Sequence, residues 1–94
     1  MYLISYDISL DSVRNKVAKE LENYGKRVQY SVFECNISEG KYLELYEKLI
    51  SHMSKTEEGN IRIYKLCGKC QQMIQTIGIY ETENNIAEDG IYFV

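Results

Sequence analysis

The chain opens with an apolar run, residues 2–8, and changes hydrophobic period directly after it. Most of these first residues are apolar or aromatic, which predicts a strand near the centre of a sheet. The next segment has one apolar stripe at helical spacing, formed by Val13, Val17, Leu21 and Tyr24. An amphipathic helix after such a strand must pack its stripe on the sheet, so a fold with one sheet layer and one helix layer is expected.

Two local signals mark the ends of this first helix. Ser9 or Asp11 is expected to act as its N-cap, since short polar side chains accept hydrogen bonds from the free amides of a first turn. Gly25 is expected to end the helix in the left-handed conformation.

The middle of the chain predicts more strand and a second helix. Residues 26–37 are rich in Val, Tyr, Phe and Ile and form one long strand or two short ones, and the pattern does not decide between them. Ser38 is the expected N-cap of an amphipathic helix. Its apolar face consists of Tyr42, Leu45, Tyr46, Leu49, Ile50 and Met53.

The remainder supplies shorter elements. Residues 61–66 predict a strand, residues 68–71 a turn, and residues 73–80 and 91–94 two extended pieces around an acidic loop. Strand, helix, strands, helix, strand in a single domain of 94 residues predicts an α+β ferredoxin-like sandwich, with two helices on one face of an antiparallel sheet. The other face needs a cover, so a homodimer is expected.

Composition excludes several classes of protein. With 45% hydrophobic and 27% charged residues the chain is an ordinary globular one, and no apolar run approaches the length of a membrane span. No signal-like leader follows Met1, so we expect a cytoplasmic protein. The odd number of cysteines, three, also favours a reducing compartment over a disulfide framework.

Charge is unevenly distributed along the chain. The formal net charge of −3 argues against a protein that is basic all over. Residues 61–75 nevertheless carry Arg62, Lys65 and Lys69 without any acidic residue. Such basic islands are compatible with contacts to phosphate groups.

The pair Cys67 and Cys70 has the spacing of half a tetrahedral zinc site. Only Cys35 and His52 remain as further ligands of the kinds that zinc prefers, and His52 belongs to the second helix. A structural turn between two strands is therefore the preferred interpretation of this pair.

Three segments resemble the small CRISPR-associated adaptation proteins, the Cas2 family. They are YDIS at 6–9, VRNKVAKELENYGKRVQYSVFEC at 13–35 and RIYKLCGKC at 62–70. The resemblance implies a ferredoxin-like homodimer in which the C-terminal strand of one subunit joins the sheet edge of the other, and it splits residues 26–37 into two strands. It divides the chain into a core domain, residues 1–78, and a C-terminal extension, residues 79–94, whose strand would pair with the partner subunit.

The resemblance also implies a function in CRISPR spacer acquisition. The dimer would be a scaffold that holds double-stranded DNA beside the larger CRISPR integrase, and it would also be a metal-dependent endonuclease. Asp7 is the implied metal ligand and catalytic residue, and Tyr6 lies beside it at the implied catalytic site. Mg²⁺ prefers carboxylate and water oxygens, and a dimer axis could bring two copies of Asp7 to one ion.

The implied nucleic-acid contacts lie on the first helix and the strands after it. Arg14 and Arg27 suit phosphate oxygens because the guanidinium is a planar, permanently charged fork. The implied set is completed by Lys16, Ser31 and Phe33. Phe33 would stack on a base or ribose or, alternatively, pack in the dimer core.

Two other functions remain open at this stage. One carboxylate per chain is sparse for a nuclease, so the protein could be a DNA-binding adaptor without chemistry, with Asp7 simply ending its strand. The second alternative is a toxin-like ribonuclease that cleaves single-stranded RNA.

Overall fold

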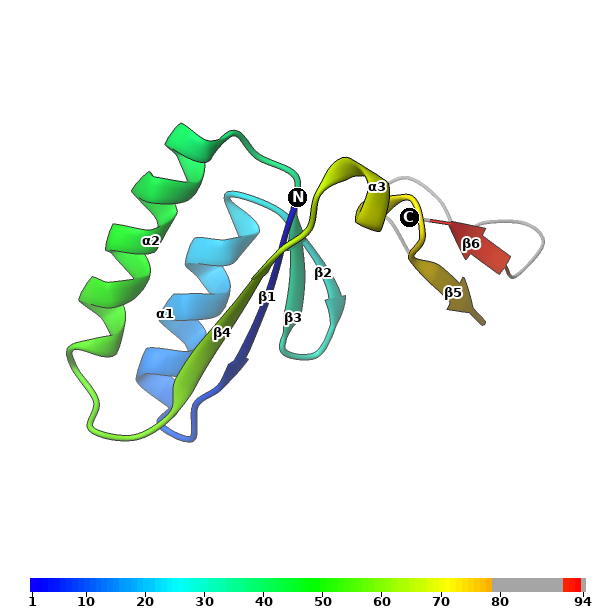
Figure 1. The fold of residues 1–94 in the computed structure, drawn as a ribbon. Coiled ribbons are helices and arrows are strands. Elements are labelled where there is room, and N and C mark those ends of the chain that lie inside the picture. The colour runs from blue at the N-terminus through cyan, green and yellow to red at the C-terminus, as the bar shows by residue number, and fades with distance from the viewer. Residues whose placement is uncertain (79–90, 94) are drawn as a thin grey trace.

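Residues 1–78 and the backbone of residues 91–93 are described by the computed structural model of the chain (Figure 1). The elements are β1 (Tyr2–Asp7), α1 (Asp11–Glu22), β2 (Lys26–Gln29), β3 (Val32–Cys35), α2 (Glu39–Met53), β4 (Asn60–Lys65), α3 (Gly68–Gln71), β5 (Gln75–Ile77) and β6 (Ile91–Phe93). Among the described residues, no helix combines the length and the apolar character needed to cross a bilayer.

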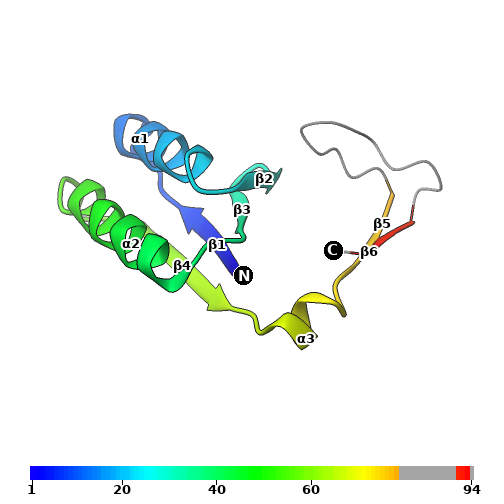
Figure 2. The same ribbon diagram turned by 90° about the horizontal axis from the view of Figure 1, so that it is seen from above.

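The main sheet has four antiparallel strands in the order β2-β3-β1-β4. On the central strand β1, Ile4 lies opposite Phe33 of β3 on one side and Ile63 of β4 on the other. Both long helices cover the same face of this sheet, as Figure 2 shows end-on. This is the ferredoxin-like arrangement, so the predicted α+β sandwich is confirmed.

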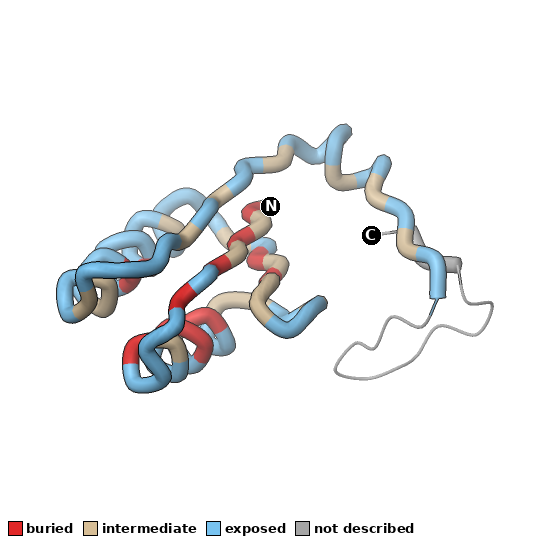
Figure 3. The backbone as a smooth tube through the Cα atoms, turned by 90° about the horizontal axis from the view of Figure 1, so that it is seen from below, coloured by how far each residue is buried: buried red, intermediate tan, exposed pale blue. Residues whose placement is uncertain are grey.

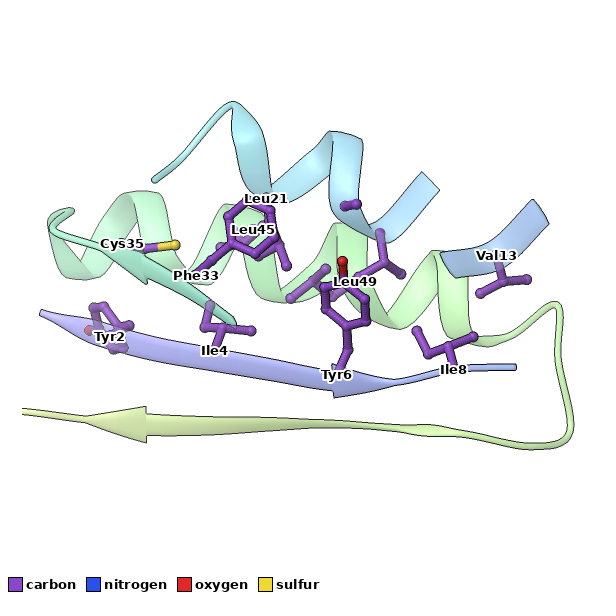
Figure 4. Close-up of a cluster of buried hydrophobic side chains, with 12 residues drawn as sticks. Tyr2, Ile4, Tyr6, Ile8, Val13, Leu21, Phe33, Cys35, Leu45 and Leu49 are labelled. Carbon is purple, nitrogen blue, oxygen red and sulfur yellow. The ribbon is translucent and has the colours of Figure 1, made fainter. Parts of the chain in front are cut away.

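The core lies between the sheet and the two helices. Along β1 the burial alternates, with Tyr2, Ile4 and Tyr6 buried and pointing to the helices (Figure 4). The helices contribute Val13, Val17, Ala18, Leu21, Leu45 and Leu49, and β3 contributes Phe33 and Cys35. The apolar stripe predicted for the first helix is therefore confirmed.

The apolar face predicted for α2 is wider than the face it buries. Leu45 and Leu49 are buried, but Tyr46 and Ile50 remain 43% and 54% exposed. The reason is that α2 packs against α1 on one side only, and no described element covers its other side.

The two predicted N-caps of α1 are wrong. Leu10 occupies the N-cap position and no side chain caps it. Asp11 is bound instead by Arg14. The amides of Ser9 and Leu10 donate to Oε1 of Glu58, at 3.1 and 3.2 Å, so a carboxylate from a distant loop holds the start of this helix.

The predicted role of Gly25 is also wrong. It does not have a positive φ angle, and α1 ends through Asn23 in the right-handed conformation. Gly25 instead lies against β3, where an added Cβ would be 2.3 Å from the carbonyl oxygen of Glu34 and 2.6 Å from Sγ of Cys35. A glycine is required here because the backbone passes too close to β3 for any side chain.

The segment at residues 26–37 forms two strands, which the family resemblance implied. The break falls at Tyr30 and Ser31, between β2 and β3. The predicted cap of the second helix is confirmed, since Oγ of Ser38 accepts a hydrogen bond from the amide of Lys41 at 3.2 Å.

The C-terminal part departs from the sandwich after β4. We call residues 66–77 together with β6 the arm; it extends away from the helices (Figures 1 and 2). The turn predicted at residues 68–71 has the form of the single-turn helix α3, which connects β4 to β5. β5 and β6 pair with each other in a separate two-stranded sheet.

This pairing bears on the expected dimer. Within one chain β6 pairs with β5, and no described strand pairs with the outer edge of β4. The predicted intersubunit role of residues 91–94 stays a prediction. The predicted domain boundary falls after Gly78, at the end of the first described range, and stays a prediction, and the acidic loop predicted after it lies outside the described residues.

Candidate nucleic-acid interface

Asp7 is the last residue of β1, and its side chain is exposed. Because Tyr6 before it points to the helices, Asp7 lies on the opposite face of the sheet, which we call the open face. Asn60 lies directly across from it on β4. Gly59, with a φ of 93°, allows the chain to reach this position, since a Cβ there would lie 2.8 Å from the carbonyl oxygen of Asp7.

The open face also carries a basic residue that our prediction of the site did not include. Arg62 is exposed and lies opposite Ser5, two positions before Asp7 on β1. Leu3 and Tyr64 form the next pair on this face. Arg62 lies on the same face of β4 as Asn60 and Tyr64, because side chains alternate along a strand. Only the register between β1 and β4 shows that Arg62 lies near Asp7.

Arg14 holds the loop that leads away from Asp7. Its Nη1 donates to the carbonyl oxygens of Ile8 and Ser9, each at 3.2 Å, and its Nη2 binds Asp11. The guanidinium is therefore engaged by its own chain at the end of β1. Its predicted contact with phosphate stays a prediction. The Arg14 side chain is 28% exposed, so such a contact would use only part of it.

Four other predicted site residues gather at the turn between β2 and β3. The hydroxyl of Tyr6 and Nη1 of Arg27 both donate to the carbonyl oxygen of Tyr30, at 3.4 and 3.1 Å. The carbonyl oxygen of Ser31 accepts a hydrogen bond from the amide of Tyr6 at 3.1 Å. The guanidinium of Arg27 lies 5.1 Å from the ring centroid of Phe33.

Two of these four residues are buried, whereas the nucleic-acid contacts predicted for Arg27 and Ser31 stay predictions. Phe33 has no exposed surface and Tyr6 is 6% exposed, so both belong to the core. Phe33 can therefore neither stack on a base nor reach a partner subunit in this arrangement. Tyr6 points to the helices, and the structure does not bring its hydroxyl to the side of the sheet where Asp7 lies.

Lys16 belongs to a second surface, between α1 and β2. An open hollow of about 580 Å³ lies there; Ser12, Asn15, Lys16, Ala18, Lys19, Glu22 and Arg27 line it. Three of these residues are basic and one is acidic. Oε1 of Glu22 lies 3.8 Å from Nη2 of Arg27 and pairs with it. Among the described residues, the two lysines are therefore the unpaired cations of the hollow. Lys19 was missed, although its spacing from Lys16 places both on one helix face.

The residues at Asp7 fit a magnesium ion only in part. Mg²⁺ often binds proteins through one or two carboxylates and keeps several waters. Among the predicted site residues Asp7 is the one carboxylate that a chain supplies, and no group of three or more His, Cys, Asp or Glu that could hold a metal occurs among the described residues. Two copies of the open face would supply two carboxylates, which suffices for this ion.

The family is decided by a sequence model that covers most of the chain. The model described as CRISPR associated protein Cas2 matches residues 1–74. The chain belongs to the Cas2 family. It is 53% identical over 78 residues to a Chloroflexus aurantiacus protein named CRISPR-associated endoribonuclease Cas2 1. The aligned region covers 82% of this chain and 83% of that protein.

Solved Cas2 structures share the fold. Cas2 of Streptococcus pyogenes matches with a TM-score of 0.68 and 31% identity, over 82% of this chain and 98% of that one. A chain from a structure described as a partial Cas6-RT-Cas1–Cas2 complex matches with a TM-score of 0.68 and 38% identity, over 78% and 84% of the two chains. The resemblance noted in the sequence is therefore confirmed, and with it the ferredoxin-like fold.

Proposed function

We propose that this Cas2 protein acts in CRISPR spacer acquisition as a homodimer that binds the backbone of double-stranded DNA. The observation that carries the proposal is the position of Asp7, exposed at the end of the central strand on a sheet face that no described element covers. A second subunit that covers this face would bring two copies of Asp7 together across a twofold axis.

The open face has the chemistry of such an interface. Tyr64 is 46% exposed and lies beside the half-buried Leu3, so covering them removes apolar surface from water. Arg62 adds positive charge to the same face. Two facing copies would therefore combine an apolar contact with two carboxylates and two guanidinium groups.

The second part of the proposal is phosphodiester hydrolysis at the paired Asp7 residues. A bound Mg²⁺ would polarise the scissile phosphate and lower the pKa of an attacking water. The Asp7 carboxylates would hold this ion, and Arg62 would bind a phosphate oxygen of the substrate. The endoribonuclease name of the Chloroflexus aurantiacus relative supports this activity, with RNA as one candidate substrate.

The third part is a role as adaptor for an integrase. The similar chain from the complex that holds Cas1 and Cas2 supports this partner. Lys16 and Lys19 in the hollow beside α1 would contact phosphates of the DNA that the complex holds. Such contacts carry little sequence information, so binding should be largely independent of sequence.

The test for catalysis is the substitution Asp7→Asn, which removes the charge and keeps the shape. We expect Mg²⁺-dependent cleavage by the purified protein to fall by about two orders of magnitude or more. Glu47→Gln is the matched control, because Glu47 is exposed on α2 and changes the net charge equally. Unchanged cleavage by Asp7→Asn would remove the catalytic role.

Catalysis and scaffolding are separated by the reaction of the complete complex. Spacer integration by Asp7→Asn with the integrase subunit should proceed if the protein is an adaptor only. Loss of integration with DNA binding intact would count against a pure scaffold. The toxin-like alternative predicts cleavage of single-stranded RNA and none of duplex DNA, which the same preparations distinguish.

A further inference from the structure

The arm carries two thiols that the proposed function does not use. Cys67 is the N-cap of the single-turn helix α3 and Cys70 lies within it, between the edge strand β4 and β5. The sulfur of Cys67 accepts a hydrogen bond from the backbone amide of Cys70 at 3.4 Å. This bond brings the Cys67 sulfur to the backbone of the residue that carries the second thiol.

The surroundings of the pair leave it open to reagents in solution. Both cysteines are free and exposed, and α3 has no buried residue. Figure 3 shows this segment outside the core, with exposed and half-buried residues only. A Cβ added to Gly68, between the cysteines, would meet no atom within 4 Å, so the turn has room to adjust when the sulfurs approach bonding distance.

We propose that Cys67 and Cys70 form a reversible dithiol–disulfide pair, with Cys67 as the attacking thiol and Cys70 as the resolving thiol. The Cys67 thiolate attacks a low-molecular-weight disulfide such as oxidised glutathione, forms a mixed disulfide and releases one thiolate. Cys70 then loses its proton, attacks the Cys67 sulfur and releases the second. Two protein thiols are oxidised, and one glutathione disulfide is reduced to two thiols.

The assignment of the two roles follows from the hydrogen bonds. The Cys70 amide, and after it the Cys70 thiol, lower the pKa of Cys67 from its ordinary value. The pKa of Cys70 is raised, because its thiol donates to Cys67 and lies next to the negative charge there. The thiolate is the nucleophile in exchange, so Cys67 reacts first.

The third cysteine provides an internal reference. Cys35 has no exposed surface, and its pKa is raised to about 11 by burial and by the charge of Glu34. It should be inert to the same reagents.

A disulfide between Cys67 and Cys70 would close a very short loop and restrict the unfolded chain little. Such a bridge therefore suits a reversible switch better than a permanent link.

The experiment uses the full chain in buffers with increasing ratios of oxidised to reduced glutathione, followed by rapid alkylation and trypsin digestion. Cleavage after Lys65 and Lys69 separates the two cysteines, since Cys70 begins a peptide without Lys or Arg that runs to Val94. The proposal predicts that residues 66–69 and 70–94 stay joined in oxidised samples and separate on reduction. Cys35, in the peptide 28–41, should remain reduced throughout.

Two serine variants test the roles of the thiols. Cys70→Ser should accumulate Cys67 in a mixed disulfide with glutathione, because no resolving thiol remains. Cys67→Ser should form the corresponding adduct on Cys70 more slowly near neutral pH, because the amide hydrogen bond that favours the Cys67 thiolate is available only in the Cys70→Ser variant. In the unmodified chain, iodoacetamide should alkylate Cys67 at least about tenfold faster than Cys35.

Several outcomes would overturn the inference. A disulfide between two chains on a non-reducing gel, in place of the joined peptides, would exclude the internal bridge. Retention of one zinc ion per two chains with both thiols protected would assign the pair to metal binding. Equal adduct rates for the two serine variants would remove the assigned order of attack. None of these readouts depends on nuclease activity or DNA binding.

Discussion

Tyr6 and Asp7 are neighbours in the chain, yet their side chains lie on opposite faces of the central strand. The ring of Tyr6 is part of the core beneath the helices, whereas the carboxylate of Asp7 is exposed on the open face. Substitutions at these two positions should therefore have separable effects, on stability for Tyr6 and on chemistry for Asp7.

Tyr6→Phe removes one hydrogen bond to the carbonyl oxygen of Tyr30, which Arg27 continues to bind. We expect the free energy of unfolding to fall by about 0.5–1.5 kcal/mol, with cleavage unchanged. Chemical denaturation measures the first and a nuclease assay the second. Tyr30→Phe, at a ring that is 78% exposed, is the control and should change stability by less than about 0.5 kcal/mol. Abolished cleavage in a folded Tyr6→Phe protein would mean that the hydroxyl acts in the reaction.

The double substitution Lys16→Gln and Lys19→Gln removes two cations from the hollow beside α1. Affinity for duplex DNA should fall, and the slope of log Kd against log salt should decrease by about 1.5–2. Fluorescence anisotropy over a salt series gives both quantities. The control carries Lys41→Gln and Lys55→Gln, which make the same charge change on α2 and just after it. Equal losses in the two variants would show that only net charge matters.

The proposed dimer predicts different effects for two tyrosines of similar exposure. Tyr64 is 46% exposed on the open face, and Tyr46 is 43% exposed on α2, on the helix side of the sheet. Tyr64→Lys should shift the protein to monomers in sedimentation experiments, because it places two cations in the interface. Tyr46→Lys should leave the dimer intact. If neither variant dissociates, or if the unmodified chain is a monomer at micromolar concentration, the open face is not the interface.

Cys35 predicts a pH dependence of stability. Burial, and then the charge of Glu34, raise its pKa from 9.0 to about 11 in the folded chain. Between these values the unfolded chain loses the thiol proton and the folded chain keeps it, so stability present below pH 9 is lost as the pH rises toward 11.

Cys35→Ala removes this titration and leaves a small cavity. The unmodified chain should have the higher free energy of unfolding at pH 8. Its difference from the variant should decrease by about 1–2 kcal/mol between pH 8 and pH 10.5. Unfolding curves at both pH values measure it. Cys67→Ala is the control, and its difference from the unmodified chain should not narrow in this way. A constant difference for Cys35→Ala would show that the thiol ionises as readily in the folded chain as in the unfolded one.

Local contacts explain why several predictions from the sequence were correct. Ser38 caps α2 through an amide three residues away, and the stripe of α1 follows from the helical period alone. The predictions for the N-cap of α1 and for Gly25 were wrong, because both positions depend on distant residues. Glu58 reaches the start of α1 across 48 residues, and Gly25 is required by a strand that follows it, so neither role is visible in the local pattern.

By itself the sequence determined the first strand, the strand β4 and the two long helices, the layer that each helix stripe must cover, and a carboxylate at the end of the first strand. These depend on side-chain periods and on neighbours in the chain. Only the tertiary structure decided which residues of different elements meet: it placed Arg62 near Asp7, packed Tyr6 beside Phe33, and buried Phe33 under Arg27. The physical reason is that the pairing of strands and the packing of helices come from contacts between distant segments, whereas periodicity shows only which residues of one segment share a face.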